Sequence, residues 1–172
     1  MRSKIFFVSV FLASLLVQGT TQAEQRPSVL GEYKNWRAFT YKEKGSVVCF
    51  ISASPKKWTS KPKNVRRGDV FFLVTHRPAL GTRNEASIYT GYTYKEKSEV
   101  IVDIDGQRFR LFTDKNTAWA RDAKADKKLI AAMRAGGKML VTGTSSRGTV
   151  TKDTYSLAGV TAAHKAINRA CR

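Results

Sequence analysis

The sequence has few of the residues from which metal, redox and hydrolytic sites are usually built. Its 172 residues include two cysteines and two histidines. A closed zinc site needs about four N, S or O ligands with suitable spacing, and the members of each pair lie far apart in the sequence. The cysteines, Cys49 and Cys171, also lack the Cys-x-x-Cys spacing of a redox-active pair. We therefore expect neither a metal site nor a cofactor.

Acidic residues are also scarce. The chain has 13 Asp and Glu against 31 Lys and Arg, which gives a formal net charge of +18. A protein with such a field attracts polyanions, which include nucleic acid, acidic glycans, lipopolysaccharide and anionic lipid headgroups. The composition therefore indicates an anionic partner without identifying it.

Long apolar runs are absent apart from one near the start of the chain. Ile5 to Val17 is nearly all apolar, follows Arg2 and Lys4, and precedes the small-residue site Thr21-Gln22-Ala23. This pattern is typical of a cleaved signal peptide, because a run of about thirteen residues is shorter than the roughly twenty that span a bilayer. We predict a signal peptide over residues 1–23 and a single domain over 24–172, with no transmembrane segment in the mature chain. Export makes nucleic acid an unlikely physiological partner.

The mature chain reads mainly as β-strands. Short apolar or alternating runs predict strands at 36–41, 46–52, 70–75, 86–90, 138–144 and 149–155. Asp105-Gly106 predicts a two-residue hairpin turn in which Ile104 faces Gln107, Val102 faces Phe109 and Asp103 faces Arg108. We expect a mainly β (α+β) fold: an antiparallel β-sandwich or partly closed barrel with two helices packed on it.

The two helices are predicted at 123–135 and about 158–171. Asp122 is the expected N-cap of the first, and Gly136-Gly137 ends it. In the second, helical spacing places Val160, Ile167 and Cys171 on one inward stripe. An oxidising compartment favours a disulfide between Cys49 and Cys171, which would link the C-terminal helix to a buried strand.

Several short strings together resemble the invasion-associated locus B family of exported bacterial proteins. They cover nearly the whole mature chain: Val48-Cys49-Phe50, Arg67-Gly68-Asp69-Val70, Trp119 to Asp122, Ala132-Met133-Arg134, Gly143 to Thr149, Asp153 to Gly159 and Ala170-Cys171. The resemblance implies a Gram-negative source, a periplasmic or outer-envelope location and a general envelope or invasion-associated role. It brings no catalytic motif.

A basic loop is the strongest candidate for a working surface. Six cations and one tryptophan occur there without an acid, and two arginines of the predicted hairpin could extend the patch: Lys56, Lys57, Trp58, Lys61, Lys63, Arg66, Arg67, Arg108 and Arg110. Tryptophan beside cations can insert at a headgroup interface or stack on a sugar. We expect a non-enzymatic protein that binds acidic lipid, lipopolysaccharide or glycan, or another envelope protein. A solvated loop that only keeps the protein soluble is the plainer interpretation.

The alternative is an unrecognised periplasmic hydrolase. A serine nucleophile needs a base within hydrogen-bond reach, and the candidates are Ser145 or Ser146 with His76 or His164. The sequence contains no Gly-x-Ser-x-Gly elbow, and Ser145 to Gly148 reads more simply as a turn. His164 lies beside the apolar stripe of the last helix, where a structural histidine is the simpler explanation.

Overall fold

The computed structural model describes residues 26–172, so the predicted signal peptide lies outside the described residues. The strands are β1 (Ser28–Tyr33), β2 (Trp36–Glu43), β3 (Ser46–Ala53), β4 (Lys57–Lys61), β5 (Phe71–Arg77), β6 (Thr82–Tyr89), β7 (Glu99–Ile104), β8 (Gln107–Asp114), β9 (Thr117–Trp119), β10 (Lys138–Thr144) and β11 (Val150–Ser156). The helices are α1 (Ala123–Ala135), α2 (Val160–Ala170) and the short 3₁₀ turn η1 (Pro78–Leu80). None of the helices in this part of the chain has the length and hydrophobicity to cross a bilayer.

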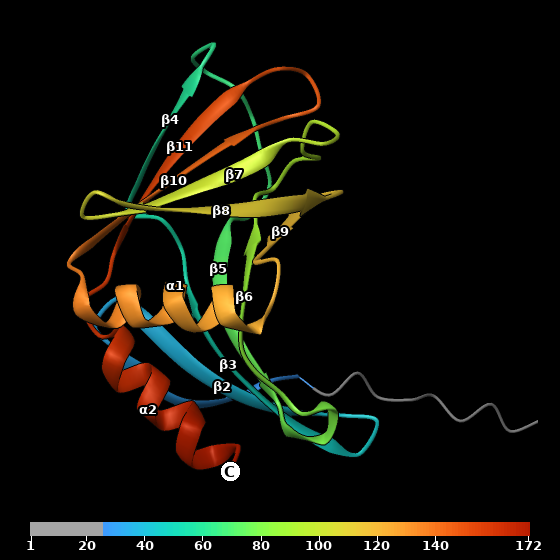
Figure 1. Ribbon diagram of the computed structural model, residues 1–172, viewed down its shortest axis with the longest axis vertical. Coiled ribbons are helices and arrows are strands. Elements are labelled where there is room, and N and C mark those ends of the chain that lie inside the picture. The colour runs from blue at the N-terminus through green and yellow to red at the C-terminus, as the bar shows by residue number, and fades with distance from the viewer. Residues whose placement is uncertain (1–25) are drawn as a thin grey trace, which may run out of the picture.

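All the strands form one antiparallel sheet that curls back on itself. The strand order is β1-β2-β3-β5-β6-β9-β8-β7-β10-β11-β4, so β1 and β4 are the free edges. Although many strands separate β2 from β11, the Trp36 indole Nε1 donates a hydrogen bond of 3.0 Å to the Ser156 carbonyl. Figure 1 shows β4, β11 and β10 at one end and β2 and β3 at the other. The predicted mainly β antiparallel fold with two helices is confirmed, and the strands form an open sheet whose edges are β1 and β4.

The β7–β8 hairpin has the predicted register. Ile104 faces Gln107 and Asp103 faces Arg108. Asp105 and Gly106 have φ values of 48° and 95°, as a turn with two left-handed residues requires. The Asp105 carboxylate also accepts a hydrogen bond of 2.7 Å from the Gly137 N–H. The turn residue therefore anchors the end of α1 as well as closing the hairpin.

The two helices pack against the concave side of the sheet. In α1 the predicted boundaries are confirmed, and the Asp122 side chain caps the helix by accepting from the Ala125 N–H at 2.7 Å. Leu129 and Met133 of α1 and Ile167 of α2 join the same buried core as Phe72 of β5. The helix α2 contacts β1, β2 and β3. The core thus fills the space enclosed by the curled sheet and the helices.

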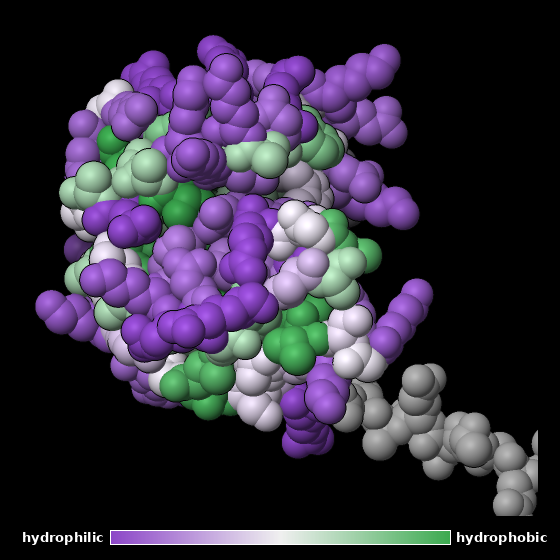
Figure 2. Space-filling view, turned by 60° about the horizontal axis from the view of Figure 1, so that its bottom comes forward, coloured by the Kyte–Doolittle hydropathy of each residue, from purple (hydrophilic) through white to green (hydrophobic). Residues whose placement is uncertain are grey.

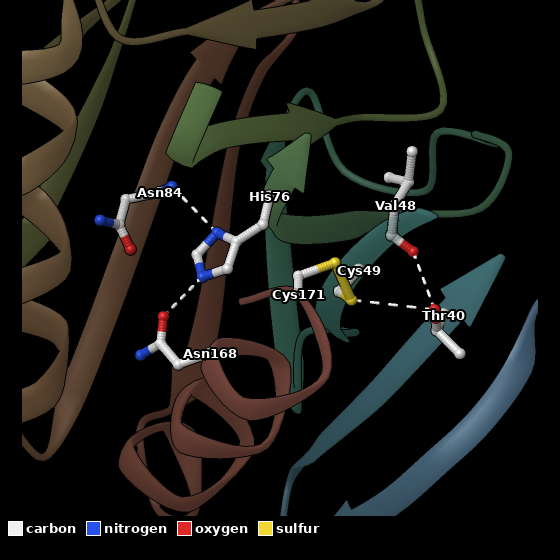
Figure 3. Close-up of a disulfide and its surroundings, with 7 residues drawn as sticks. All are labelled: Thr40, Val48, Cys49, His76, Asn84, Asn168 and Cys171. Carbon is white, nitrogen blue, oxygen red and sulfur yellow. Dashed lines mark hydrogen bonds between the residues drawn. A yellow bond between two sulfur atoms is a disulfide. The ribbon is translucent and has the colours of Figure 1, made fainter. Parts of the chain in front are cut away.

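A disulfide joins Cys49 of β3 to Cys171, the residue that ends α2. Both residues are buried, and Figure 3 shows the bond beside the last turn of the helix. The predicted link between the C-terminal helix and a buried strand is confirmed.

Three strands, β1, β4 and β9, were not predicted from the sequence. The segment predicted as a basic loop contains β4, an edge strand that pairs with β11 and with no other strand of residues 26–172. Its residues Lys57-Trp58-Thr59-Ser60-Lys61 lack an apolar alternation because most of their side chains face solvent. Its strand conformation comes from hydrogen bonds to β11, which lies about ninety residues away in the sequence.

Candidate anion-binding surface

Five predicted cations surround the edge strand β4 with their side chains exposed: Lys56, Lys57, Lys61, Lys63 and Arg66. None of them makes an ion pair with any residue between 26 and 172. Figure 2 shows that hydrophilic side chains cover most of the face in view, with small hydrophobic patches between them. The positive charge around β4 is therefore not neutralised by neighbouring carboxylates.

The strand registers place the two hairpin arginines on the same outer face as the lysines of β4. Lys57 faces Thr154, Thr154 faces Leu140, Leu140 faces Asp103 and Asp103 faces Arg108, which makes one row across five strands. The row spans about 19 Å, because neighbouring strands lie about 4.8 Å apart. A parallel row joins Thr59 of β4 to Arg110 of β8.

That parallel row also contains Lys152 of β11, an exposed cation that the sequence reading missed. The alternation of exposed and buried side chains along β11 could have predicted that Lys152 faces outward. The two arginines differ from the lysines, because Arg108 pairs with Asp103 at 3.3 Å and Arg110 pairs with Glu99 at 2.8 Å. They extend the basic face but carry less free charge.

Arg67 is not part of this exposed surface, which corrects its place in the predicted set. Its guanidinium forms a two-pronged ion pair with the Asp153 carboxylate of β11, and the two side chains are 4% and 2% exposed. A buried arginine is stable only when its charge is paired and its donors are used. Arg67 therefore has an internal partner instead of an external ligand.

The backbone beside Arg67 is held by a close approach of two glycines. The Gly68 N–H donates to the Gly91 carbonyl at 2.9 Å. Gly91 has a φ of +72°, and a Cβ there would lie 2.3 Å from the Gly68 carbonyl oxygen. Only glycine fits at position 91, and the contact fixes the chain that carries Arg67.

Trp58 lies between the buried ion pair and solvent. The guanidinium carbon of Arg67 stacks on the indole, 4.3 Å from the ring centroid, while Trp58 as a whole residue remains 43% exposed. A hollow of about 420 Å³ adjoins the ring and is lined by Trp58, Thr59, Ser60, Lys63, Asn64 and Val65. One face of the indole is braced and the hollow lies beside the ring.

The interior behind this pair is aromatic and stays neutral. Tyr155 is fully buried and its hydroxyl has no hydrogen-bond partner among the described residues. Burial raises the pKa of both Tyr155 and Tyr94 far above that of a free phenol, and nearby Asp153 adds to the effect. The two tyrosines therefore stay uncharged, and the negative charge that balances Arg67 is that of Asp153.

The histidines form a closed polar ring with two asparagines instead of meeting a serine. The Asn84 N–H donates to His76 Nδ1 at 3.1 Å, which leaves the proton of His76 on Nε2 to donate to Asn168 Oδ1 at 2.8 Å (Figure 3). The Asn168 amide donates to His164 Nδ1 at 3.2 Å, and His164 Nε2 donates to Asn84 Oδ1 at 2.6 Å. Each ring nitrogen of His76 and His164 therefore makes a hydrogen bond, and both imidazoles are neutral in this arrangement.

The candidate serines lie at the β10–β11 turn, away from that ring. The Ser145 hydroxyl accepts a hydrogen bond of 3.1 Å from the Thr149 N–H, and the Gly148 N–H donates to the Ser145 carbonyl at 2.8 Å. These are the contacts of a turn. The residues required by the hydrolase alternative are therefore not brought together.

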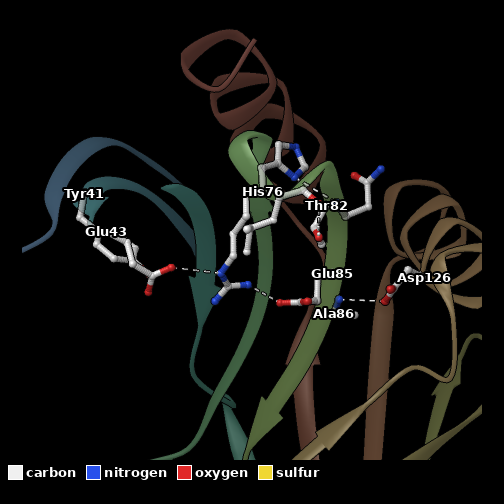
Figure 4. A network of polar contacts seen from close by, with 10 residues as sticks. Tyr41, Glu43, His76, Thr82, Glu85, Ala86 and Asp126 are labelled. Carbon is white, nitrogen blue, oxygen red and sulfur yellow. Dashed lines mark hydrogen bonds and ion pairs between the residues drawn. The ribbon is translucent and has the colours of Figure 1, made fainter. Parts of the chain in front are cut away.

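Two further buried groups have shifted pKa values. Burial, with the nearby charge of Arg134, lowers the pKa of His164 to about 4. Burial also raises the pKa of Asp126 of α1 to about 6, although its carboxylate accepts a hydrogen bond from the Ala86 N–H at 2.8 Å (Figure 4). Glu85 and Asp122 add to that rise, and the sequence reading did not identify Asp126.

An arginine on the outer side of the sheet connects two strands near Asp126. Arg77 of β5 pairs with Glu85 of β6 and lies 3.7 Å from Glu43 of β2. Figure 4 shows the carboxylate of Asp126 on the other side of β6 from this group. The pairs leave Arg77 neutralised, unlike the lysines of β4.

Comparisons with known proteins place this chain in a described family. Residues 36–168 match the family model described as Invasion associated locus B (IalB) protein. The fold resembles the crystal structure of invasion associated protein B from Bartonella henselae, with a TM-score of 0.51 and 13% sequence identity over 81% of this chain and 95% of that one. No match was found among curated proteins.

Proposed function

The chain belongs to the invasion-associated locus B family, and we propose that it is an exported, non-enzymatic envelope protein. Its basic surface around β4 binds anionic components of the envelope or of a host surface. Acidic lipid, lipopolysaccharide and acidic glycan are the candidate ligands, and another envelope protein with an acidic surface is a further candidate.

Export is supported by the sequence of the first 23 residues and by the disulfide. We propose that residues 1–23 are a cleaved signal peptide and that 24–172 form one mature domain in the periplasm or associated with the outer envelope. A disulfide between Cys49 and Cys171 is typical of an oxidising compartment. Removal of the signal peptide leaves a net charge of about +16, so the mature protein keeps its attraction for polyanions.

The observation that carries the binding proposal is the set of five exposed and unpaired cations around β4. A cation that already has a carboxylate partner gains little from a second one, whereas Lys57 and Lys61 have no such partner among the described residues. Each Lys or Arg near an anionic membrane surface contributes about 1 kcal/mol of binding free energy. Five such residues on one strand and its flanks make a sufficient electrostatic site.

The experiment compares two variants with the same loss of charge. The first replaces Lys56, Lys57, Lys61, Lys63 and Arg66 by Ser. The second replaces five exposed cations of the helices by Ala: Lys124, Lys127, Lys128, Lys165 and Arg169. Binding to vesicles of phosphatidylglycerol and phosphatidylcholine, and to lipopolysaccharide, is measured at increasing salt.

We expect the β4 variant to lose on the order of 100-fold or more in vesicle affinity, and the helix variant to lose much less. Wild-type binding should weaken steeply with salt, because exposed charges are screened over about 8–10 Å at physiological ionic strength. Equal losses in both variants, or salt-independent binding, would contradict the proposal. A pull-down from envelope extracts with the same variants then tests for a protein partner.

A further inference from the structure

We infer that the hollow beside Trp58 is a subsite for an acidic sugar, whose ring stacks on the open face of the indole and whose anionic group pairs with Lys63. The inference rests on the proposed function and narrows it, because it selects an acidic saccharide over a lipid headgroup as the ligand of this part of the surface.

The first argument is that the indole is held in place before any ligand arrives. Arg67 covers one face of Trp58 at 4.3 Å, and Arg67 is itself fixed by Asp153 inside the protein. A side chain that is already ordered loses little conformational entropy on binding. Flat apolar rings of this kind suit the flat apolar face of a pyranose, and 43% of Trp58 is open to solvent.

The second argument is the polarity of the hollow. Its lining includes Ser60, whose hydroxyl donates to the Pro62 carbonyl at 2.7 Å and can still accept a hydrogen bond, and Asn64, whose φ is +59°. Sugar hydroxyls can exchange hydrogen bonds with these groups. An acyl chain would remove them from water without replacing those bonds, which is costly. The lining therefore favours a saccharide over insertion into a lipid layer.

The third argument is the position of the charges. The guanidinium under the ring is neutralised by Asp153, so Lys63 is the free cation of the hollow. Trp58 and Ser60 lie on the opposite side of β4 from Lys57 and Lys61, because they face Asp153 and Thr151 of β11. The strand thus presents general basic charge on one side and, on the other, a hollow with polar residues and one cation in its lining. The volume of about 420 Å³ lies within the usual range of small-ligand sites.

The test uses tetragalacturonate, an acidic tetrasaccharide, and its methyl ester, which has the same rings without the charge. Binding is measured by isothermal titration calorimetry with the mature protein. We expect Trp58→Ala to weaken tetragalacturonate binding by about tenfold and Trp58→Phe by less, because a smaller ring keeps part of the stacking. Lys63→Ala should weaken it several-fold, to about the level that wild type shows for the methyl ester.

Matched controls remove an equivalent group elsewhere. Phe112 is 41% exposed on β8 and controls for the loss of an exposed aromatic ring, and Lys165 on α2 controls for the loss of one exposed cation. Phe112→Ala and Lys165→Ala should each bind within about twofold of wild type. Thermal unfolding of each variant verifies that it is folded at the temperature of the titration.

The outcomes separate this inference from the proposed function. If tetragalacturonate binds equally well to Trp58→Ala, or if its methyl ester binds as tightly as the acid, the sugar subsite is wrong. If vesicles bind, depend on Trp58, and tetragalacturonate does not bind, a lipid headgroup takes its place and the inference is overturned. If neither the tetrasaccharide, the vesicles nor lipopolysaccharide bind in a salt-dependent way, the proposed function itself is overturned.

Discussion

Two buried polar networks lie in different parts of this protein, and they differ in where they end. The ring of His76, His164, Asn84 and Asn168 beside the disulfide closes on itself, so each histidine nitrogen has a partner inside the protein. The pair between Arg67 and Asp153 of β11 ends on the half-exposed indole of Trp58. A closed network can contribute only to the fold, whereas an open one also positions a surface group.

The difference shows which perturbations should affect stability alone. Changes near the disulfide and the histidine ring should alter unfolding without altering ligand binding. Changes at the Arg67–Asp153 pair should alter both, because Trp58 depends on that pair for its position.

The largest stability effect is expected from reduction of the disulfide, at the closed end. Cys49 and Cys171 are 122 residues apart, and on the chain-entropy model a loop of that size stabilises the protein by about 5 kcal/mol. Denaturant unfolding with and without reductant measures the loss, and free-thiol titration verifies the reduction. An unchanged transition after complete reduction would show that the bond has no such role.

The next largest effect is expected from Asp153→Asn, at the open end. This change leaves Arg67 buried without a counter-charge, which costs about 3–5 kcal/mol of unfolding free energy. The double variant Arg67→Met/Asp153→Leu should recover most of the loss, because apolar residues of similar size replace both charges. If the double variant is as unstable as Asp153→Asn, the penalty does not come from an unpaired buried charge.

A third prediction concerns the pH dependence of stability, to which His164 and Asp126 contribute in opposite directions. The pKa of His164 is about 4 in the folded protein and 6.5 in the unfolded chain, so its contribution makes the protein less stable as the pH falls from 6.5 to 4. The pKa of Asp126 is about 6 in the folded protein and 3.8 in the unfolded chain, so its contribution makes the protein more stable as the pH falls from 6 to 3.8. Each contribution is at most about 3 kcal/mol, so the two nearly cancel in the wild type.

Single variants should reveal each contribution separately. When the pH is lowered from 6.5 to 4, the free energy of unfolding of Asp126→Asn should fall. When it is lowered from 6 to 3.8, the free energy of unfolding of His164→Gln should rise. Urea unfolding at half-unit pH steps measures both slopes. Parallel pH profiles in the two variants would show that these groups do not set the pH dependence.

The smallest effect is expected from the paired arginines of the outer face. Arg108→Ser/Arg110→Ser should change stability by less than about 1 kcal/mol, since exposed ion pairs contribute little. Vesicle binding should weaken less than in Lys57→Ser/Lys61→Ser, which removes the same charge from unpaired residues. A larger loss in the arginine variant would place the binding surface on the β7–β8 hairpin instead of β4.

The parts of the fold that depend on local sequence could be predicted. Asp105-Gly106 specifies the hairpin register, Asp122 and Gly136 mark the ends of α1, and helical spacing turns Cys171 toward the core. Each of these signals lies within a few residues of the structure that it determines.

The parts that depend on distant partners could not be predicted. Arg67 reads as one more cation of a basic segment, because its partner Asp153 is 86 residues away. The edge strand β4 has no apolar pattern, and Asp126 becomes unusual only when β6 packs over it. The sequence identified the charges around β4, but the distinction between paired and free cations needed the structure.

The most direct test of the difference between the two networks is the affinity for tetragalacturonate of Arg67→Met/Asp153→Leu beside that of His164→Gln. Both variants are measured by calorimetry at a temperature where circular dichroism shows them folded. We predict that His164→Gln binds within about twofold of wild type, while the double variant, which has lost the guanidinium beneath Trp58, binds about tenfold more weakly. Equal affinities in the two variants, or a larger loss in His164→Gln, would contradict the assignment of the open network to binding.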